Sequence, residues 1–121
     1  MNWQFSNDAP IYTQLVRQIR AGIVSGAFSP GERLPSVRDL AMEAGVNPNT
    51  MQRALAELER TGLVYTQRTA GRFVTEDAAV IDSAKQELAH QQIGAFLRRM
   101  ERMGYDREQA AQLVRSWKEE A

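Results

Sequence analysis

Four polar side chains, Asn49, Thr50, Gln52 and Arg53, lie within five residues of a segment that we expect to be helical. Amide, hydroxyl and guanidinium groups form the hydrogen bonds that nucleic-acid base edges and phosphates offer. Taken singly, each of these side chains is equally well explained as a solvated surface residue. Their position in the first turns of the helix favours DNA recognition, because a recognition helix contacts bases with its N-terminal residues.

A tight turn joins two predicted helices between Leu34 and Val64. Ser36 and Asn47 have side chains that cap helix starts, and Pro48 suits a first helical position because no N–H is needed there. Gly45 supplies the backbone conformation that the break between the helices requires. The inner face of the second helix carries an apolar stripe made of Met51, Ala54, Leu55 and Leu58. These features predict a helix-turn-helix.

A two-stranded hairpin is predicted directly afterwards, over residues 63–75, with a turn at residues 68–71. A hairpin in this place makes the motif a winged helix-turn-helix. Arg68 and Arg72 lie around Gly71. Arginine suits phosphates or a narrow minor groove, and glycine lets the backbone approach DNA closely. The alternative is an exposed hairpin whose arginines only keep the protein soluble.

The segment before this motif is predicted to be a long helix that starts near Pro10 and stops at Gly26. Its apolar residues recur along one face, which comprises Ile11, Leu15, Val16, Ile19 and Ile23. Trp3 and Phe5 precede this helix. We expect them to pack in the core, because large aromatic side chains usually bury their surface.

The composition changes after the hairpin. Residues 78–102 are rich in Ala, Gln, Leu, Arg and Glu and predict a long helix. Asp106 and Gln109 have the spacing of a capping box, which starts a second helix. These helices carry more apolar surface than they can hide against each other, so they must pack on the first domain, on a second copy, or on both. We therefore predict a winged helix-turn-helix at residues 1–76 and a C-terminal helical hairpin at residues 77–121, which is a mainly α fold with a small β-hairpin.

Several classes of protein are disfavoured by the composition. There is no cysteine, and His90 is the only histidine, which excludes disulfides, thiolate metal sites and histidine-rich metal sites. The sequence has no nucleophile–histidine set, no phosphate-binding glycine loop and no paired carboxylates at a plausible cleft, so we predict no enzyme, cofactor or metal. No apolar run approaches the roughly 20 residues of a membrane span, and no secretory signal is found. We expect a soluble cytoplasmic protein.

The formal net charge is zero, from 15 basic and 15 acidic residues. This balance argues against nucleic-acid binding by bulk charge. It agrees with a sequence-specific binder that gathers its basic residues on one face, and the residues of interest are Arg33, Arg38, Arg53, Arg68 and Arg72. Neutrality also leaves open a winged helix that binds another protein and no DNA, because fold alone does not fix function.

Three separated stretches of the sequence resemble the GntR family of bacterial transcription regulators. They are Pro10–Leu15, Ser25–Ala41 and Gly45–Leu63, and they appear in the order that the family has. The resemblance covers residues 10–75. The Val-Asn-Pro-Asn-Thr sequence at residues 46–50 and the short two-helix tail look like the YtrA-like subfamily. Larger GntR proteins carry a full ligand-binding or aminotransferase-like domain after the DNA-binding part.

The resemblance implies roles for the positions that match. The arginine of the Pro-Ser-x-Arg-x-Leu-Ala motif contacts DNA in GntR-like proteins, and here it is Arg38. The wing-tip glycine corresponds to Gly71. The polar residues that start the recognition helix correspond to Asn47, Asn49 and Thr50. Gln52 and Arg53 depart from the residues that many members have, so we expect this protein's own DNA preference to lie there. The full predicted set of DNA contacts is Arg33, Arg38, Asn47, Asn49, Thr50, Gln52, Arg53, Arg68, Gly71 and Arg72.

The resemblance also implies a homodimeric repressor that binds a palindromic operator in double-stranded DNA. The tail would be the dimer interface, and the residues expected there are Ile81, Leu88, Phe96, Leu97, Met100, Leu113 and Trp117. A repressor needs a signal. We therefore expect a small-molecule effector that acts at the tail or at its junction with the first domain.

Overall fold

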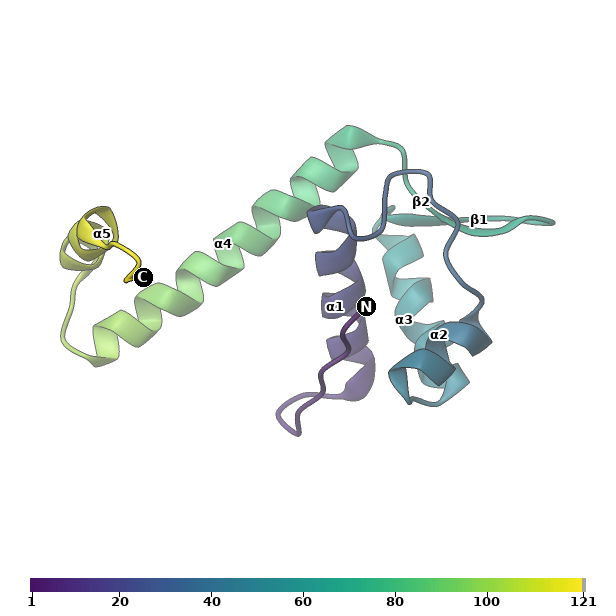
Figure 1. Cartoon of the computed structure of the whole chain (residues 1–121), viewed down its shortest axis with the longest axis horizontal. Helices are drawn as coiled ribbons and strands as arrows, with labels where there is room; N and C mark the ends of the chain where they lie inside the picture. The colour runs from purple at the N-terminus through teal and green to yellow at the C-terminus, as the bar shows by residue number, and fades with distance from the viewer. Residues whose placement is uncertain (121) are drawn as a thin grey trace. The chain divides into compact units, whose positions relative to one another are not determined.

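The computed structural model describes residues 1–120 and shows five helices and one hairpin among them (Figure 1). In chain order these elements are α1 (Ile11–Ser25), α2 (Val37–Ala44), α3 (Pro48–Arg60), β1 (Val64–Gln67), β2 (Gly71–Val74), α4 (Ala78–Arg102) and α5 (Arg107–Ser116). They form two compact units, Met1–Lys85 and the residues from Gln86 onward. The first unit has the helix-turn-helix followed by an antiparallel hairpin, which confirms the predicted fold class.

The core of the first unit lies between α1 and α3, which pack side by side (Figure 1). Leu15 of α1 and Leu55 of α3 are fully buried, and α2 adds Leu40 to the same cluster. The predicted stripe of α3 is confirmed, since Met51, Ala54, Leu55 and Leu58 all have an exposed fraction of zero. Burial of this stripe fixes which side of α3 faces outward.

The N-terminal segment covers the first turns of α1, and the structure there differs from the sequence prediction. Ile11, which we predict on the buried face of this helix, is exposed, and Gln14 is buried instead. The side-chain amide of Gln14 accepts from the N–H of Ser6 at 2.9 Å and donates to the carbonyls of Ser6 and Ala9 at 2.9 and 2.7 Å. A buried amide with satisfied hydrogen bonds is well tolerated. It ties the N-terminal segment to the helix.

The aromatic residues at the start of the chain pack as predicted. The rings of Trp3 and Phe5 stack with their centroids 6.4 Å apart, and both side chains are partly buried against the core. Their burial confirms the prediction that they are packing residues.

Both capping residues of the helix-turn-helix act as predicted. The hydroxyl of Ser36 accepts a hydrogen bond from the N–H of Asp39 at 3.1 Å, at the start of α2. The side-chain oxygen of Asn47 accepts from the N–H of Asn49 at 2.8 Å, at the start of α3. Gly45 ends α2 with a φ of 72°, in the left-handed region that favours glycine. The turn between the two helices is therefore encoded locally.

The connector before α2 pairs with the hairpin, which the sequence did not indicate. The N–H groups of Gly31 and Leu34 donate to the carbonyls of Val74 and Arg72, each at 2.9 Å. Strand β2 is thus hydrogen-bonded on both sides, to β1 and to the connector. This pairing holds Arg33 next to the hairpin.

The hairpin is also braced to the end of α3. The Nε of Arg72 donates to the carboxylate of Glu59 at 2.9 Å, and the hydroxyl of Thr66 donates to the same carboxylate oxygen. Partial burial raises the pKa of Glu59, but the hydrogen bonds from Thr66 and Arg72 outweigh it and hold that pKa below its ordinary value. The ionised carboxylate therefore contributes to the stability of the hairpin on α3.

The first turns of α4 belong to the first unit. Val80, Ile81 and Ala84 are partly buried and pack against the core of that unit. The unit therefore extends to Lys85, beyond the predicted division after residue 76. Ile81, which we expected at a dimer interface, contacts the core of its own chain.

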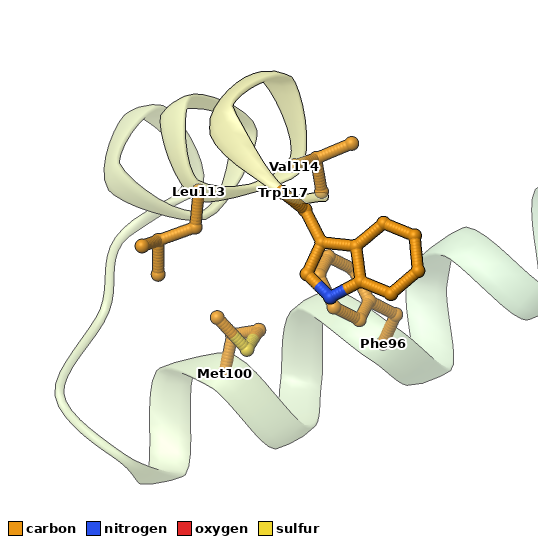
Figure 2. Close-up of a pocket in the computed structure, with 5 residues that line it drawn as sticks. All are labelled: Phe96, Met100, Leu113, Val114 and Trp117. Carbon is orange, nitrogen blue, oxygen red and sulfur yellow. The ribbon is translucent and has the colours of Figure 1, made fainter. Parts of the chain in front are cut away.

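The second unit has little interior of its own. Asp106 and Gln109 form the predicted capping box of α5, with hydrogen bonds of 2.8 and 2.9 Å. Ala110 is the one fully buried residue that α5 contributes, and the described part of α4 contributes none. A hollow of about 400 Å³ lies between the two helices (Figure 2). It is lined by Phe96, Met100, Leu113, Val114 and Trp117, and Trp117 is 71% exposed.

The brace on Glu59 predicts a defined dependence of stability on pH. Because the folded-state pKa of Glu59 lies below its ordinary value of 4.5, its stabilising effect is present above pH 4.5 and is lost as the pH falls through the folded-state pKa. At pH 7 we expect Glu59→Gln to lower the free energy of unfolding by about 1 kcal/mol. Urea denaturation from pH 7 to pH 3 should show this difference from the wild type shrinking below pH 4.5.

Glu57→Gln is the matched control. Glu57 lies on the same helix and pairs with Arg60 at 2.5 Å, but the side chain of Arg60 is 71% exposed, whereas that of Arg72 is 19% exposed. Exposed pairs contribute little, so this change should leave the free energy of unfolding close to that of the wild type. If the two substitutions lowered the free energy of unfolding equally at pH 7, the stabilising role of the Glu59 carboxylate would be contradicted.

Candidate nucleic-acid interface

The start of α3 presents polar side chains on the face opposite the core. Asn49, Gln52 and Arg53 are exposed, and Thr50 is half-buried. They lie there because the buried stripe of the same helix fixes its rotation against α1. The structure therefore brings together the amides, the hydroxyl and the guanidinium that the sequence singled out.

Asn47 lies at the same end of α3, but its side-chain oxygen is already used in a hydrogen bond within the protein. Its side-chain oxygen accepts the capping hydrogen bond from the N–H of Asn49. Any contact that Asn47 makes with a ligand must therefore use its side-chain NH₂ group or its backbone. Its first function in the structure is to start the helix.

A residue of α1 joins this surface, and sequence reasoning missed it. The guanidinium carbon of Arg53 lies 3.7 Å from the centroid of the Tyr12 ring, which is a cation–π contact. A shallow hollow of about 380 Å³ surrounds the pair, lined by Pro10, Ile11, Tyr12, Asn49, Thr50 and Arg53. The two residues are 41 positions apart, so no local pattern signals the contact.

A groove of about 320 Å³ runs between the hairpin and the start of α2. Its lining includes Arg33 and Ser36 on one side and Arg68 and Gly71 on the other. Gly71 has a φ of 107°, and a Cβ there would lie 3.1 Å from the Nε of Arg33. Glycine at this place therefore meets two needs, an unusual backbone conformation and room for Arg33 against the hairpin.

Arg72 differs from the other arginines of the predicted set. Its side chain is only 19% exposed, and its Nε is used by Glu59 inside the protein. The position of Arg72 next to the wing tip is thus explained by its hydrogen bond to Glu59, which links β2 to α3. Whether Arg72 also contacts DNA stays a prediction.

Arg38 and Arg68 are the freest cations of the predicted set. Arg38 lies in the first turn of α2 and Arg68 in the turn of the hairpin, and both are exposed. Neither takes part in a salt bridge to another residue between 1 and 120. Their charges are therefore available to an anion such as phosphate.

Two other kinds of site are excluded for the described residues, a metal centre and a membrane span. No group of three or more His, Asp or Glu side chains among residues 1–120 is arranged to hold a metal ion. Within the same range, no helix is both long and apolar enough to cross a lipid bilayer. The polar surface built by α3, α2 and the hairpin is therefore the candidate site of the first unit.

Comparisons with known proteins agree with this arrangement. Residues 11–74 match the family described as bacterial regulatory proteins, gntR family. Over 119 residues the chain is 37% identical to the HTH-type transcriptional regulator YhcF of Bacillus subtilis, and the match covers 98% of each protein. It is also 42% identical over 72 residues to the HTH-type transcriptional repressor YtrA of Bacillus subtilis, which covers 60% of this chain and 55% of that protein.

Solved structures show the same fold. A GntR family transcriptional regulator from Listeria monocytogenes matches with a TM-score of 0.84 and 38% identity, over 94% of this chain and 100% of that one. The DNA-binding domain AraR(DBD), solved in complex with operator ORX1, matches with a TM-score of 0.57 and 26% identity, over 62% of this chain and 96% of that one. The match of residues 11–74 and the full-length similarity to YhcF show that the chain belongs to the GntR family of bacterial regulatory proteins.

Proposed function

We propose that this protein is a homodimeric repressor that binds a palindromic operator, with α3 in the major groove and the hairpin beside it. The observation that carries the proposal is the exposed polar start of α3, flanked by the unpaired cations Arg38 and Arg68. The operator complex of AraR(DBD), which has the same fold, supports a DNA-binding role. The repressor YtrA supports the sign of regulation.

The chemistry of the side chains divides their proposed contacts. Asn49 and Gln52 carry amides that match adenine edges, which present one donor and one acceptor in the major groove. Arg38 and Arg68 suit phosphates, which fix the register of the protein on the duplex. Zero net charge is compatible with this division, because two acidic residues of α3, Glu57 and Glu59, are paired with arginines.

The tail supports the proposed dimer. From Gln86 to the last residue the second unit contains 36 residues. Units below about 40 residues usually need disulfides, metals or oligomerisation to be stable. The sequence has no cysteine, and the described residues have no metal-binding cluster. The exposed apolar side chains around the hollow in Figure 2 are then the surface that a second copy would cover.

Control by a small-molecule effector of unidentified chemistry completes the proposal, since a repressor must be released by a signal. Screening small molecules for a rise in the melting temperature of the protein tests this part by itself, because a ligand that binds only the folded state stabilises it.

The decisive experiment is selection of bound duplexes from a randomised DNA pool. We expect the retained sequences to contain an inverted repeat whose half-sites are about 34 Å, or one helical turn, apart. The symmetry of the repeat follows from the two-fold symmetry of a dimer. Retention of no duplex would favour the alternative, a winged helix that binds another protein, which the neutral net charge alone supports.

Arg38→Ala tests the assigned phosphate contact. The variant should weaken binding to the selected operator and to its base variants about equally, and should lower the salt slope by about one per subunit. The control is Lys85→Ala, which removes one positive charge from the same unit outside the proposed interface. Fluorescence anisotropy measures both, and the assigned role fails if folded Arg38→Ala binds as tightly as Lys85→Ala.

Phe96→Asp tests the proposed dimer. A carboxylate in the apolar hollow cannot be covered by a second copy without a large desolvation cost, so we expect a monomer by light scattering. The matched control is His90→Asp, which places the same charge on an exposed position of the same helix. A Phe96→Asp variant that stays dimeric would exclude this face as the interface.

A further inference from the structure

Arg53 lies on the outer part of α3, yet its guanidinium turns toward α1. Its central carbon lies 3.7 Å from the centroid of the Tyr12 ring, which places the charge against one face of the aromatic system. Tyr12 itself is partly buried against the core, so the ring is held by the protein interior. The guanidinium of Arg53 therefore has a fixed neighbour on a rigid helix.

Stacking leaves the hydrogen-bonding capacity of Arg53 intact. A guanidinium stacks through its flat face, while its five N–H donors point outward in the plane. None of the residues that line the surrounding hollow is acidic, and Arg53 forms no salt bridge with residues 1–120. The result is a positioned cation with free donors.

The side on which Arg53 is held separates it from Gln52. Successive residues of a helix point about 100° apart. Relative to the buried stripe of α3, Arg53 leans to the flank of Thr50 and Tyr12, and Gln52 lies on the other flank. When a helix lies in the major groove, its outermost side faces the base edges and its flanks face the groove walls, which are phosphates.

We propose that Tyr12 is a positioning residue that holds Arg53 on this flank, where Arg53 binds a DNA phosphate and does not read a base. The proposal rests on the proposed function, because it assigns a contact within the same DNA interface. It leaves the sequence-reading role to Asn49, which lies opposite the buried stripe of α3. Tyr12 acts through Arg53 and touches no base itself.

The first test uses the free protein and needs no DNA. Protons of a guanidinium above an aromatic ring are shielded by its ring current, so the side-chain NMR signals of Arg53 should be shifted upfield. Tyr12→Phe keeps the ring and should keep the shift, whereas Tyr12→Leu should abolish it. Signals of Arg53 at ordinary positions in the wild type would overturn the proposal, even if the protein binds no DNA.

The second test measures affinity for the selected operator across a series of salt concentrations. Tyr12→Leu should weaken binding about two- to fivefold, which is the size of one exposed cation–π contact. Tyr12→Phe should bind like the wild type, because it keeps the ring and removes only the hydroxyl. Arg53→Ala should weaken binding to all operator variants equally and lower the salt slope by about one per subunit.

The double variant decides whether Tyr12 works through Arg53. Tyr12→Leu combined with Arg53→Ala should bind no more weakly than Arg53→Ala alone, because the stack has nothing left to position. Additive losses would overturn the positioning role. A change of preferred base at one operator position in Arg53→Ala would overturn the phosphate assignment. Failure of the wild type to bind any duplex would instead overturn the proposed function.

Discussion

Burial of one stripe of α3 against α1 is the constraint on which the rest of the structure depends. Leu55 and Leu58 have no exposed surface, and neither can rotate outward without opening the core. The rotation of α3 about its axis is therefore fixed, and Asn49, Gln52 and Arg53 must lie on its open sides. A helix that was free to roll would present these groups in many directions and would bind any one arrangement of bases weakly. Core packing thus fixes the directions in which the polar side chains of α3 point, although no core residue belongs to that polar surface.

A second layer of constraint holds the hairpin. Strand β2 is paired on both edges, and the carboxylate of Glu59 fixes the hairpin to the end of α3 through Arg72 and Thr66. Two-stranded hairpins alone are marginally stable, so these extra bonds matter more here than in a larger sheet. They also use up the acidic group that lies nearest to the wing. The consequence is a neutral protein with a locally cationic face, since the remaining arginines at the interface are left without acidic partners.

The elements that local chemistry encodes could be predicted from the sequence. The caps at Ser36, Asn47 and Asp106 depend on side chains that bond to backbone within three residues, and all three were found where expected. Contacts between distant segments could not be predicted in this way. The stack of Tyr12 on Arg53 and the pairing of the connector with β2 join residues about 40 positions apart, and neither leaves a periodic pattern. Arg72 is the converse case. Its place beside the wing predicts a DNA contact, and only the structure shows that its Nε bonds to Glu59 of α3.

These distant contacts separate the two members of the unusual pair Gln52–Arg53. In the sequence the two residues are neighbours and are predicted together to carry the DNA preference. In the structure a ring from α1 holds Arg53 to one flank of α3, and Gln52 lies on the other flank. An arginine that is fixed against an aromatic face loses less conformational entropy on binding than a free one, and this gain is the same for every DNA sequence. Under the proposed contacts, affinity from Arg53 and specificity from Asn49 have separate physical origins, so relatives that keep Tyr12 and Arg53 but vary at residue 49 should share binding strength and differ in the operator that they prefer.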